Sequence, residues 1–455
     1  MPVAEINDWP WRHWQRRRPQ ALAVDAGGVT LSWEQLAQDI VQHAQGFRQQ
    51  GVIPGQRVIL RSANSLQAVV SWLSLLACGA QVLVLNPQLP DSQLSAVFAS
   101  LAADFILGSD SAASAEIPAL VNLRSAGQVI QPWQPDVPAT LTLTSGSGGL
   151  PKAAVHPLRA HLHSAAAVTA LMDFTARDRW LLSLPLFHIS GLGILWRWLL
   201  RGATLTLADS AGFVAALSRC SFASLVPTQL WRLLQLPDRP QGVHTVLLGG
   251  ATIAPELVQQ AEAAGIRCFC GYGMTESAST VCAKRADGNP GVGQPLAGQQ
   301  VNIVNGEVWL RSPTLAVGYW QHGHLQPLTD ADGWLHSGDL GVWQQNELCV
   351  SGRRDNLFFC GGEAVQPEMI ERLLLRHPRV SQVMVVARKD AEYGNRPVAL
   401  VNTETDLEQL AEWVLPQLTA WQRPVKWYPL PTLNGGGIKL SRYQLTQWVA
   451  RQPHE

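Results

Sequence analysis

The sequence has little charge and little cysteine. Asp, Glu, Lys and Arg make up only 15% of its 455 residues, whereas 47% are hydrophobic, a composition that excludes a disordered chain and indicates a globular protein. Lys plus Arg equals Asp plus Glu, at 34 each, so no overall charge draws the molecule to nucleic acid or to an anionic membrane. The seven cysteines are scattered and odd in number, which predicts free thiols in a reducing compartment and hence a cytoplasmic protein.

The sequence also lacks the patterns of an export signal and of a membrane span. Its first eighteen residues, MPVAEINDWPWRHWQRRR, contain no apolar core of the signal-peptide type, so we expect no export. The longest apolar stretch, residues 68–85, is interrupted at Gly79, Ala80 and Gln81. A membrane span needs about 20 continuous apolar residues, so this stretch instead predicts a buried helix, a glycine stop and a buried strand.

The arrangement of hydrophobic residues predicts an α/β fold with two domains. Through the first 300 residues helical and strand patterns alternate, for example a helix over residues 32–49 followed by a short strand over 57–60. Such alternation predicts layers of helices around parallel strands that are buried on both faces. Short strands with turns follow from about residue 299. We place a large N-terminal domain over residues 1–353 and a small α+β domain over residues 354–455.

The segment TLTSGSGGLPK, residues 142–152, is rich in glycine and hydroxyl groups. Glycines let backbone amides approach a phosphate closely, and Lys152 adds charge, so the segment could cradle a phosphate; a surface linker has a similar composition. Lys152 follows proline and precedes alanines, which differs from the Gly-Lys-Ser/Thr of a Walker A loop. The segment alone leaves both interpretations open.

Further short motifs follow in order along the chain: LPLFHISGL (184–192), LLGGA (247–251), GYGMTES (271–277), HSGDLG (336–341), GRRDNLFFCGGEAVQPEMIE (352–371) and NGGGIKLSR (434–442). Together with TSGSGGLPK they resemble the acyl-adenylate-forming (AMP-binding) enzyme superfamily over nearly the whole chain. The resemblance implies layered α/β subdomains with a distorted β-barrel portion, followed by a small mobile C-terminal domain. It also implies an AMP-forming acyl-CoA ligase that uses ATP with Mg²⁺ and takes CoA as co-substrate.

The same resemblance assigns residues to ATP. Tyr272 would lie near the adenine, and Asp339 would accept both ribose hydroxyls, as a carboxylate can. The full set implied for ATP is Thr144, Ser145, Gly146, Ser147, Gly148, Gly149, Lys152, Gly249, Gly250, Ala251, Tyr272, Gly273, Met274, Asp339 and Arg353.

Four residues are implied to be catalytic. Thr275 would contact the α-phosphate, Glu276 would bind Mg²⁺, which prefers hard oxygen ligands beside phosphates, and His188 would border the acyl pocket. Lys439 would bind the attacking carboxylate together with the α-phosphate, where its charge offsets two anions.

The small domain carries the remaining implied roles. Asp355 would be the hinge about which it turns, and Gly361 and Gly362 would face a channel for the pantetheine of CoA. Two positions depart from the family pattern. Gly148 stands where a hydroxyl residue is usual, and Ile438 precedes Lys439 where glycine is usual.

The acyl substrate is suggested by the segment FHISGLGILWRWLL, residues 187–200, in which Arg197 lies among Trp and Leu residues. An arginine on an apolar helix needs an anionic partner if it points inward, and an aromatic dicarboxylic acid would supply one; the alternative is that Arg197 extends to the surface. The compact length, the FHISGLG string and Arg197 resemble the o-succinylbenzoate-CoA ligase branch of menaquinone biosynthesis, with Ser190 near the acyl group.

Other functions remain open at this stage. They are another aryl- or medium-chain acyl-CoA synthetase, an enzyme that adenylates acids for a carrier protein, and an inactive nucleotide-binding protein. The last is disfavoured because Lys152, Glu276, Asp339 and Lys439 are all present. The sequence leaves self-association open and predicts small-molecule partners only.

Overall fold

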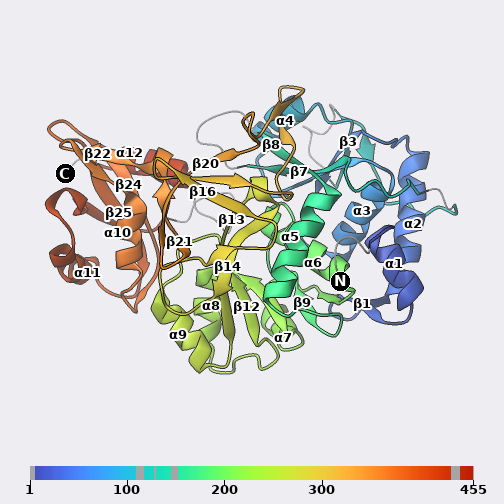
Figure 1. Ribbon diagram of the computed structural model, residues 1–455, viewed down its shortest axis with the longest axis horizontal. Helices are drawn as coiled ribbons and strands as arrows, with labels where there is room; N and C mark the ends of the chain where they lie inside the picture. The colour runs from blue at the N-terminus through green and yellow to red at the C-terminus, as the bar shows by residue number, and fades with distance from the viewer. Residues whose placement is uncertain (1–5, 109–116, 128–129, 145–151, 432–440, 454–455) are drawn as a thin grey trace.

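The computed structural model describes residues 6–108, 117–127, 130–144, 152–431 and 441–453. The molecule is elongated, with the last hundred residues at one end of its long axis and the first hundred toward the other (Figure 1). In this described part, no helix is long and apolar enough to cross a membrane.

The first sheet contains strands from residues 22 to 295. Its strands are β1 (Leu22–Asp25), β2 (Thr30–Ser32), β9 (Arg179–Leu181), β10 (Thr204–Thr206), β11 (Phe222–Leu225), β12 (Thr245–Leu248), β13 (Arg267–Met274), β14 (Ser279–Arg285) and β15 (Gln294–Pro295). They run in the order β15-β14-β13-β12-β11-β9-β10-β1-β2. The strands from β13 to β1 in this order are parallel, and the pairings at both edges are antiparallel.

The second sheet joins the N-terminal strands to a hairpin from much later in the chain. Its strands are β3 (Arg57–Arg61), β4 (Gln81–Leu85), β5 (Phe105–Leu107), β6 (Ala119–Leu120), β7 (Pro138–Leu143), β8 (Ala153–Pro157), β18 (Gly318–Gln321) and β19 (His324–Pro327). Their order is β19-β18-β8-β7-β4-β3-β5-β6. The hairpin of β18 and β19 therefore extends this sheet beside β8.

Two antiparallel sheets complete the fold. The third sheet runs in the order β16 (Gln300–Val304), β17 (Glu307–Arg311), β20 (Leu335–Gln344) and β21 (Glu347–Arg353). The fourth runs in the order β23 (Glu363–Val365), β22 (Phe358–Cys360), β25 (Gly394–Thr403) and β24 (Val380–Asp390), and β26 (Lys426–Pro429) pairs with β25. The described strands form no closed barrel, so the distorted barrel portion expected from the sequence stays a prediction.

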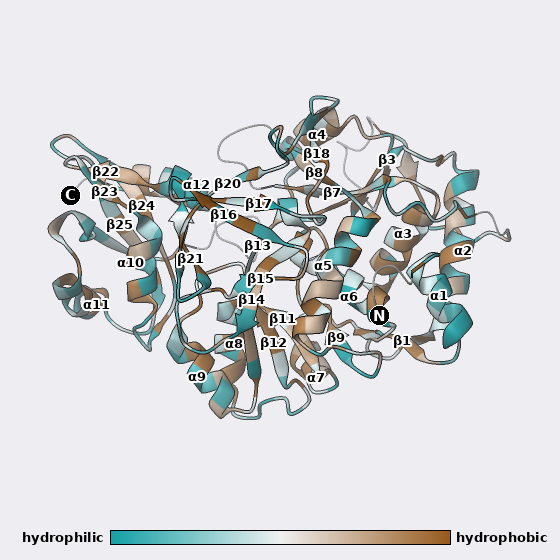
Figure 2. Ribbon diagram, viewed as in Figure 1, coloured by the Kyte–Doolittle hydropathy of each residue, from teal (hydrophilic) through white to brown (hydrophobic). Residues whose placement is uncertain are grey.

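Helices cover the sheets and share the core with the strands. They are α1 (Pro10–Arg17), α2 (Trp33–Gln49), α3 (Leu66–Ala77), α4 (Asp91–Leu101), α5 (Leu158–Leu171), α6 (Ile189–Arg201), α7 (Phe213–Leu217), α8 (Pro227–Leu234), α9 (Pro255–Ala263), α10 (Pro367–Leu374), α11 (Leu407–Val414) and α12 (Arg442–Ala450). Side chains from α2, α3, α5 and α6 share one large hydrophobic core, in which Trp33 stacks on Trp198 with ring centroids 5.3 Å apart. In Figure 2 the buried helix α3 is drawn mostly in brown.

The alternating α/β layers predicted from the sequence are confirmed. The helix expected over residues 32–49 is α2. The Gln35 amide donates to the Ser32 hydroxyl and the Ser32 amide donates to Gln35 Oε1, a reciprocal pair that stabilises a helix start. The stretch 68–85 is the end of buried α3, then Gly79 in the left-handed region at φ +81°, then buried β4, as expected.

Candidate functional site

The glycine-rich segment lies between two paired strands. β7 and β8 are antiparallel neighbours, and the Thr144 amide donates to the Lys152 carbonyl at 3.0 Å, which closes the base of the connection. Ser145, Gly146, Ser147, Gly148 and Gly149 lie outside the described residues, so their implied contacts with ATP remain predictions.

Lys152 is placed by an aromatic ring that comes from another part of the chain. Its ammonium lies 3.8 Å from the centroid of the Tyr319 ring. Tyr319 is on β18, opposite Ala154 of β8, so strand pairing brings the ring to the lysine. A cation over an aromatic face at this distance is attracted by the ring, and the contact leaves the ammonium partly exposed.

The GYGMTES motif forms the end of β13 and the single turn η3 (Thr275–Ser277). Gly273 is required there, because a Cβ atom at that position would lie 1.7 Å from the Ser279 carbonyl oxygen. After the turn, Ala278 and Ser279 both have positive φ angles, +51° and +115°. Residues other than glycine seldom take such angles, and strain of this kind concentrates at functional sites.

Glu276 is held through both its backbone and its side chain. Its carbonyl oxygen accepts from the Ala316 amide at 2.8 Å and lies 3.3 Å from the Nε2 atom of His156. Its Oε1 atom accepts a hydrogen bond from the Tyr319 hydroxyl at 2.6 Å. Burial and the Glu276 charge raise the pKa of Tyr319, so the phenol keeps its proton and remains the donor.

The surroundings of Glu276 fit Mg²⁺ better than a metal held by protein ligands alone. Its Oε2 atom makes no hydrogen bond within the described ranges. Among the described residues, no three His, Cys, Asp or Glu side chains are grouped closely enough to hold a metal ion. A single carboxylate, with phosphates and water as the other ligands, is typical of Mg²⁺ in nucleotide sites.

A second tyrosine contacts a carboxylate on the side predicted to bind ribose. The Tyr272 hydroxyl donates to Asp339 Oδ2 at 2.6 Å, while Arg353 Nη1 donates to Asp339 Oδ1 at 3.2 Å and to the Ser337 carbonyl at 2.9 Å. Burial and the Asp339 charge raise the pKa of Tyr272 well above its usual value. Burial alone would lower the pKa of Arg353, but Asp339 and Asp355 raise it. The structure therefore brings together three of the residues predicted to contact ATP.

The glycine turn predicted to contact adenine follows β12, beside β13. Leu248 at the end of β12 pairs with Cys270, so Gly249 to Ala251 lie next to the start of the GYGMTES segment. Gly250 has a φ of +81°, and an added Cβ at Gly249 would contact nothing within 4 Å. The backbone is thus open on this side.

Arg197 points into the protein instead of extending to the surface. It lies on α6 with 2% of its surface exposed, and its guanidinium lies 5.1 Å from the centroid of the Trp180 ring. Nη1 donates to the Ser224 hydroxyl at 3.4 Å, and Nη2 donates to the Ser279 hydroxyl at 3.2 Å. The Nε–H is buried and makes no hydrogen bond within the described part of the chain.

The charge of Arg197 has no counter-ion among the described residues. Burial lowers its pKa to about 9, a value that still leaves the guanidinium charged at neutral pH. A buried charge without an opposite charge is costly, so the arrangement is suited to an anionic ligand.

The other residues predicted for the acyl group lie at the start of α6. His188 precedes the helix, with its ring 4.7 Å from the ring of Phe187, and Ser190 is half-buried in the first turn. Ser190, Gly193 and Arg197 follow one another at spacings of three and four residues, which puts them on one face of the helix. A Cβ atom on Gly193 would lie 3.3 Å from both Arg197 Nη2 and Ser279 Oγ. This glycine therefore leaves room for the guanidinium.

The small C-terminal part carries the residues predicted for the CoA channel and for the hinge. Gly361 and Gly362 connect β22 to β23 with φ angles of +59° and +87°, and the Gly361 amide donates to the Tyr393 carbonyl at 2.9 Å. Asp355 lies on the surface in the turn after β21, 3.6 Å from Arg353 Nη2. Lys439 lies outside the described residues, whereas Arg442, three residues later, begins α12. The hinge and channel roles stay predictions.

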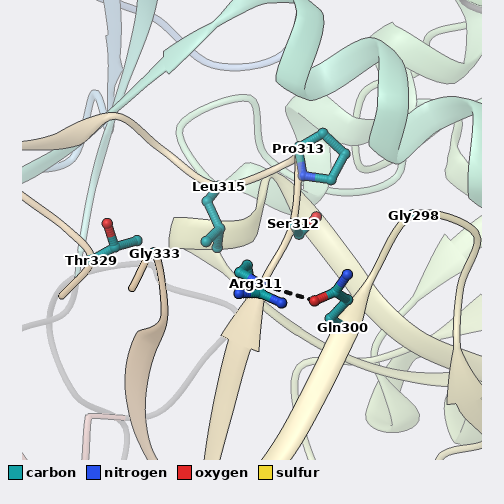
Figure 3. Close-up of a pocket in the computed structure, with 8 residues that line it drawn as sticks. All are labelled: Gly298, Gln300, Arg311, Ser312, Pro313, Leu315, Thr329 and Gly333. Atoms are coloured by element: carbon teal, nitrogen blue, oxygen red, sulfur yellow. Dashed lines mark hydrogen bonds between the residues drawn. The ribbon is translucent and has the colours of Figure 1, made fainter. Parts of the chain in front are cut away.

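A pocket of about 310 Å³ lies elsewhere, beside the start of β16 and the end of β17. Figure 3 shows its lining, in which Arg311 donates to the Gln300 side chain at 2.8 Å. None of the residues predicted for ATP, acid or CoA lines it, so it is separate from the candidate site.

Sequence reasoning missed several residues that the fold brings to the site. Tyr319, His156, Ser224 and Ser279 contact the predicted residues but belong to segments without a motif of their own. Only Ser279 carried a signal, since it closely follows GYGMTES.

Comparison with known proteins agrees with this geometry. The sequence matches the AMP-binding enzyme family over residues 11–320 and the AMP-binding enzyme C-terminal domain over residues 369–434. A 2-succinylbenzoate--CoA ligase of Escherichia coli is 48% identical over 451 residues, which cover 98% of this chain and 99% of that protein. The Haemophilus influenzae protein of the same name is 41% identical over 434 residues, covering 93% and 94%.

Solved structures show the same fold. A variant of the Escherichia coli enzyme MenE with bound OSB-AMS matches with a TM-score of 0.91 and 46% identity, covering 98% of this chain and 99% of that one. MenE of Bacillus subtilis in complex with ATP and magnesium ion matches with a TM-score of 0.85 at 23% identity, covering 97% and 99%, a likeness of fold alone. The fold class expected from the sequence is thereby confirmed.

Proposed function

The chain belongs to the AMP-binding enzyme family, and from this premise we propose that it joins the succinyl carboxylate of 2-succinylbenzoate to CoA at the expense of ATP. It is an AMP-forming acyl-CoA ligase, and its product, 2-succinylbenzoyl-CoA, serves menaquinone biosynthesis. The similarity to 2-succinylbenzoate--CoA ligases over nearly the full length of both chains supports this activity.

The buried, uncompensated guanidinium of Arg197 is the observation that carries the substrate assignment. The single carboxylate of a monocarboxylic acid reacts with ATP, so such an acid would leave Arg197 without an anion. 2-Succinylbenzoate carries a second carboxylate on its ring, which can pair with the guanidinium directly or through water. Ser279, which contacts Arg197, lies only three residues beyond Glu276, so the acid would bind close to the phosphate side.

The first chemical step forms an acyl-adenylate. The succinyl carboxylate oxygen attacks the α-phosphorus of ATP, a new O–P bond forms, the bond between the α-phosphorus and the bridging oxygen breaks, and pyrophosphate leaves. Thr275 would contact the α-phosphate, Lys152 the departing phosphates and Lys439 both the carboxylate and the α-phosphate. Mg²⁺ bound with ATP neutralises phosphate charge, and Glu276 would hold it.

The second step transfers the acyl group to sulfur. The thiolate of CoA attacks the acyl carbon, the bond from that carbon to the AMP oxygen breaks, and AMP leaves; the thiol proton is lost to solvent. We propose that residues 354–455 turn about Asp355 between the steps, which would withdraw Lys439 and bring Gly361 and Gly362 to the thiol channel.

The place of action follows from the chemistry of the chain. All seven cysteines are free, which supports a reducing compartment and hence the cytoplasm. ATP, CoA and the acid are the partners we propose, and self-association is left as an open prediction.

The assignment can be tested by removing the ring carboxylate of the substrate and the guanidinium of Arg197, first separately and then together. Pyrophosphate release with ATP and CoA would be measured for 2-succinylbenzoate and for 3-benzoylpropionate, which lacks the ring carboxylate, using the wild type and Arg197→Met. We expect the wild type to favour 2-succinylbenzoate by about 10- to 100-fold in kcat/KM, because a hydrogen-bonded charge pair is lost with the analogue.

The variant distinguishes loss of the ion pair with the ring carboxylate from a general loss of activity. Arg197→Met should lose most of the preference while the KM for ATP changes little. Strong turnover of benzoate or octanoate with none of 2-succinylbenzoate would contradict the assignment. An unchanged preference in Arg197→Met would leave the activity intact but move the ring carboxylate away from Arg197.

A further inference from the structure

Tyr319 stands between the two charged groups of the phosphate side. Its hydroxyl donates to Glu276 Oε1 at 2.6 Å, and the Lys152 ammonium lies 3.8 Å from its ring centroid. One side chain thus contacts both the predicted metal ligand and the predicted phosphate lysine.

The backbone around Tyr319 fixes this position. The Ala316 amide donates to the Glu276 carbonyl at 2.8 Å, and the Val317 amide donates to the Val155 carbonyl at 2.9 Å. Residues 316 and 317 therefore attach the start of β18 to both the η3 turn and β8. Gly318 lets β18 pair closely with β19, because a Cβ atom there would lie 2.3 Å from the Gln326 carbonyl oxygen.

The hydrogen bond determines which carboxylate oxygen of Glu276 is available. Oε1 is occupied by a phenol, and a carboxylate held at one oxygen has lost most of its rotational freedom. Oε2 then presents to a cation in one orientation. Preorganised ligands of this kind bind a metal more tightly than free ones do.

The ring of Tyr319 has a different task from its hydroxyl. Its face attracts the Lys152 ammonium without neutralising it, as a carboxylate would, so the full positive charge stays available to phosphates.

We propose that Tyr319 is a positioning residue for ATP and its metal: its hydroxyl orients Glu276 toward Mg²⁺, and its ring holds Lys152 ready for the phosphates. This inference rests on the proposed function for the identity of the ligands. It assigns the two halves of one side chain to two separable effects.

Two substitutions separate these effects. Tyr319→Phe removes the hydroxyl and keeps the ring, whereas Tyr319→Leu removes both. At saturating ATP and 2-succinylbenzoate, we expect Tyr319→Phe to raise the free Mg²⁺ concentration needed for half-maximal pyrophosphate release by about tenfold, with the KM for ATP at saturating Mg²⁺ within about twofold. Tyr319→Leu should show the same metal shift and also raise the KM for ATP several-fold.

A binding measurement that needs no turnover gives the second readout. Electron paramagnetic resonance would follow the binding of Mn²⁺ in the presence of α,β-methylene-ATP, whose α–β bond is not cleaved. Tyr319→Phe should weaken Mn²⁺ binding by a factor similar to the Mg²⁺ shift, and a thermal melt would report any loss of folding separately.

Tyr272→Phe is the matched control, because it removes a hydroxyl that donates at the same 2.6 Å to a different carboxylate, Asp339. It should alter the KM for ATP and leave the metal dependence unchanged. Wild-type metal dependence in Tyr319→Phe, or an equal metal shift in Tyr272→Phe, would overturn the inference. If the proposed function were wrong, the wild type itself would fail to release pyrophosphate with 2-succinylbenzoate, so the two failures are distinguishable.

Discussion

Two arginines, Arg442, which is half-buried, and Arg197, which is buried, have opposite surroundings. Arg442, at the start of α12, makes ion pairs with Glu371 at 2.8 Å and Glu368 at 3.4 Å. Arg197, on α6, has only the hydroxyls of Ser224 and Ser279 and the Trp180 ring.

This contrast is expected if Arg442 serves the fold and Arg197 serves a ligand. Arg442 also donates to the Val385 carbonyl, and the Val385 amide donates to Glu371 Oε1 at 2.7 Å. The charge of Arg442 is therefore balanced within the protein. These contacts join α10, β24 and α12 next to the tail that carries Lys439. The surroundings of Arg197 are neutral, so they stabilise its position without satisfying its charge.

The largest expected effect is on the free energy of unfolding, when Arg442 is replaced. Arg442→Met leaves the Glu371 carboxylate buried without its cation, which should lower the free energy of unfolding by about 3–5 kcal/mol. Arg197→Met removes a buried charge that has no counter-ion, so stability should stay within about 1 kcal/mol or rise. Urea denaturation followed by circular dichroism and tryptophan fluorescence would measure both.

A double variant provides the control. Arg442→Met combined with Glu371→Gln removes both charges and should recover part of the lost stability. A loss for Arg197→Met as large as that for Arg442→Met would mean that Arg197 is held for the fold and not for a ligand.

A smaller effect concerns buried groups that stay neutral. His156 and His161 are buried with their rings 5.0 Å apart, and His161 stacks on Trp196. Burial lowers the pKa of His156 to about 4 and that of His161 well below its usual value. Below about pH 6.5 the unfolded chain gains protons that the folded chain excludes. Stability is therefore complete above that pH and should fall toward pH 4, by about 1.4 kcal/mol per pH unit for each histidine.

The comparison of unfolding free energies at pH 7 and pH 5 tests this. His156→Gln should reduce the difference between the two pH values, whereas substitution of the exposed His324 by Gln should not. An unchanged difference in His156→Gln would show that this histidine is protonated in the folded protein.

The smallest expected effect is on the KM for 2-succinylbenzoate, when Gly193 beside Arg197 is replaced. Gly193→Ala places a methyl group 3.3 Å from both Arg197 Nη2 and Ser279 Oγ, closer than side chains usually pack. The guanidinium must shift by a few tenths of an ångström, so we expect the KM for 2-succinylbenzoate to rise several-fold, with that for ATP unchanged. Alanine favours a helix over glycine by roughly 0.5–1 kcal/mol, so stability should not fall. Steady-state kinetics with each substrate would show the effect, and an equal rise for ATP would contradict the local explanation.

The sequence predicted much of the fold because its patterns are local. Periodic apolar residues and the glycine after α3 mark elements without reference to distant parts of the chain. The motif residues Tyr272, Asp339 and Arg353 were predicted to share a ligand, and Tyr272 and Arg353 both contact Asp339.

The rest depends on pairings that no local pattern encodes. Tyr319 reaches Glu276 only because β18 adds to the edge of β8, more than 160 residues earlier in the chain. Arg197 could extend outward or inward by sequence alone, and the packing of α6 against the first sheet decides that it points inward. Ser145 to Gly149 and Lys439 lie outside the described residues, so their roles rest on resemblance.

The neutral contacts of Arg197 also bear on how enzymes of this kind can diverge. A charge that is paired inside a protein cannot be replaced without a second substitution at its partner, so two changes must occur together. Arg197 leaves behind only two serines, which water or a small shift can satisfy. A single exchange of Arg197 for a leucine-sized residue would therefore leave a stable protein. From that protein, specificity could change from dicarboxylic to monocarboxylic acids by further single substitutions.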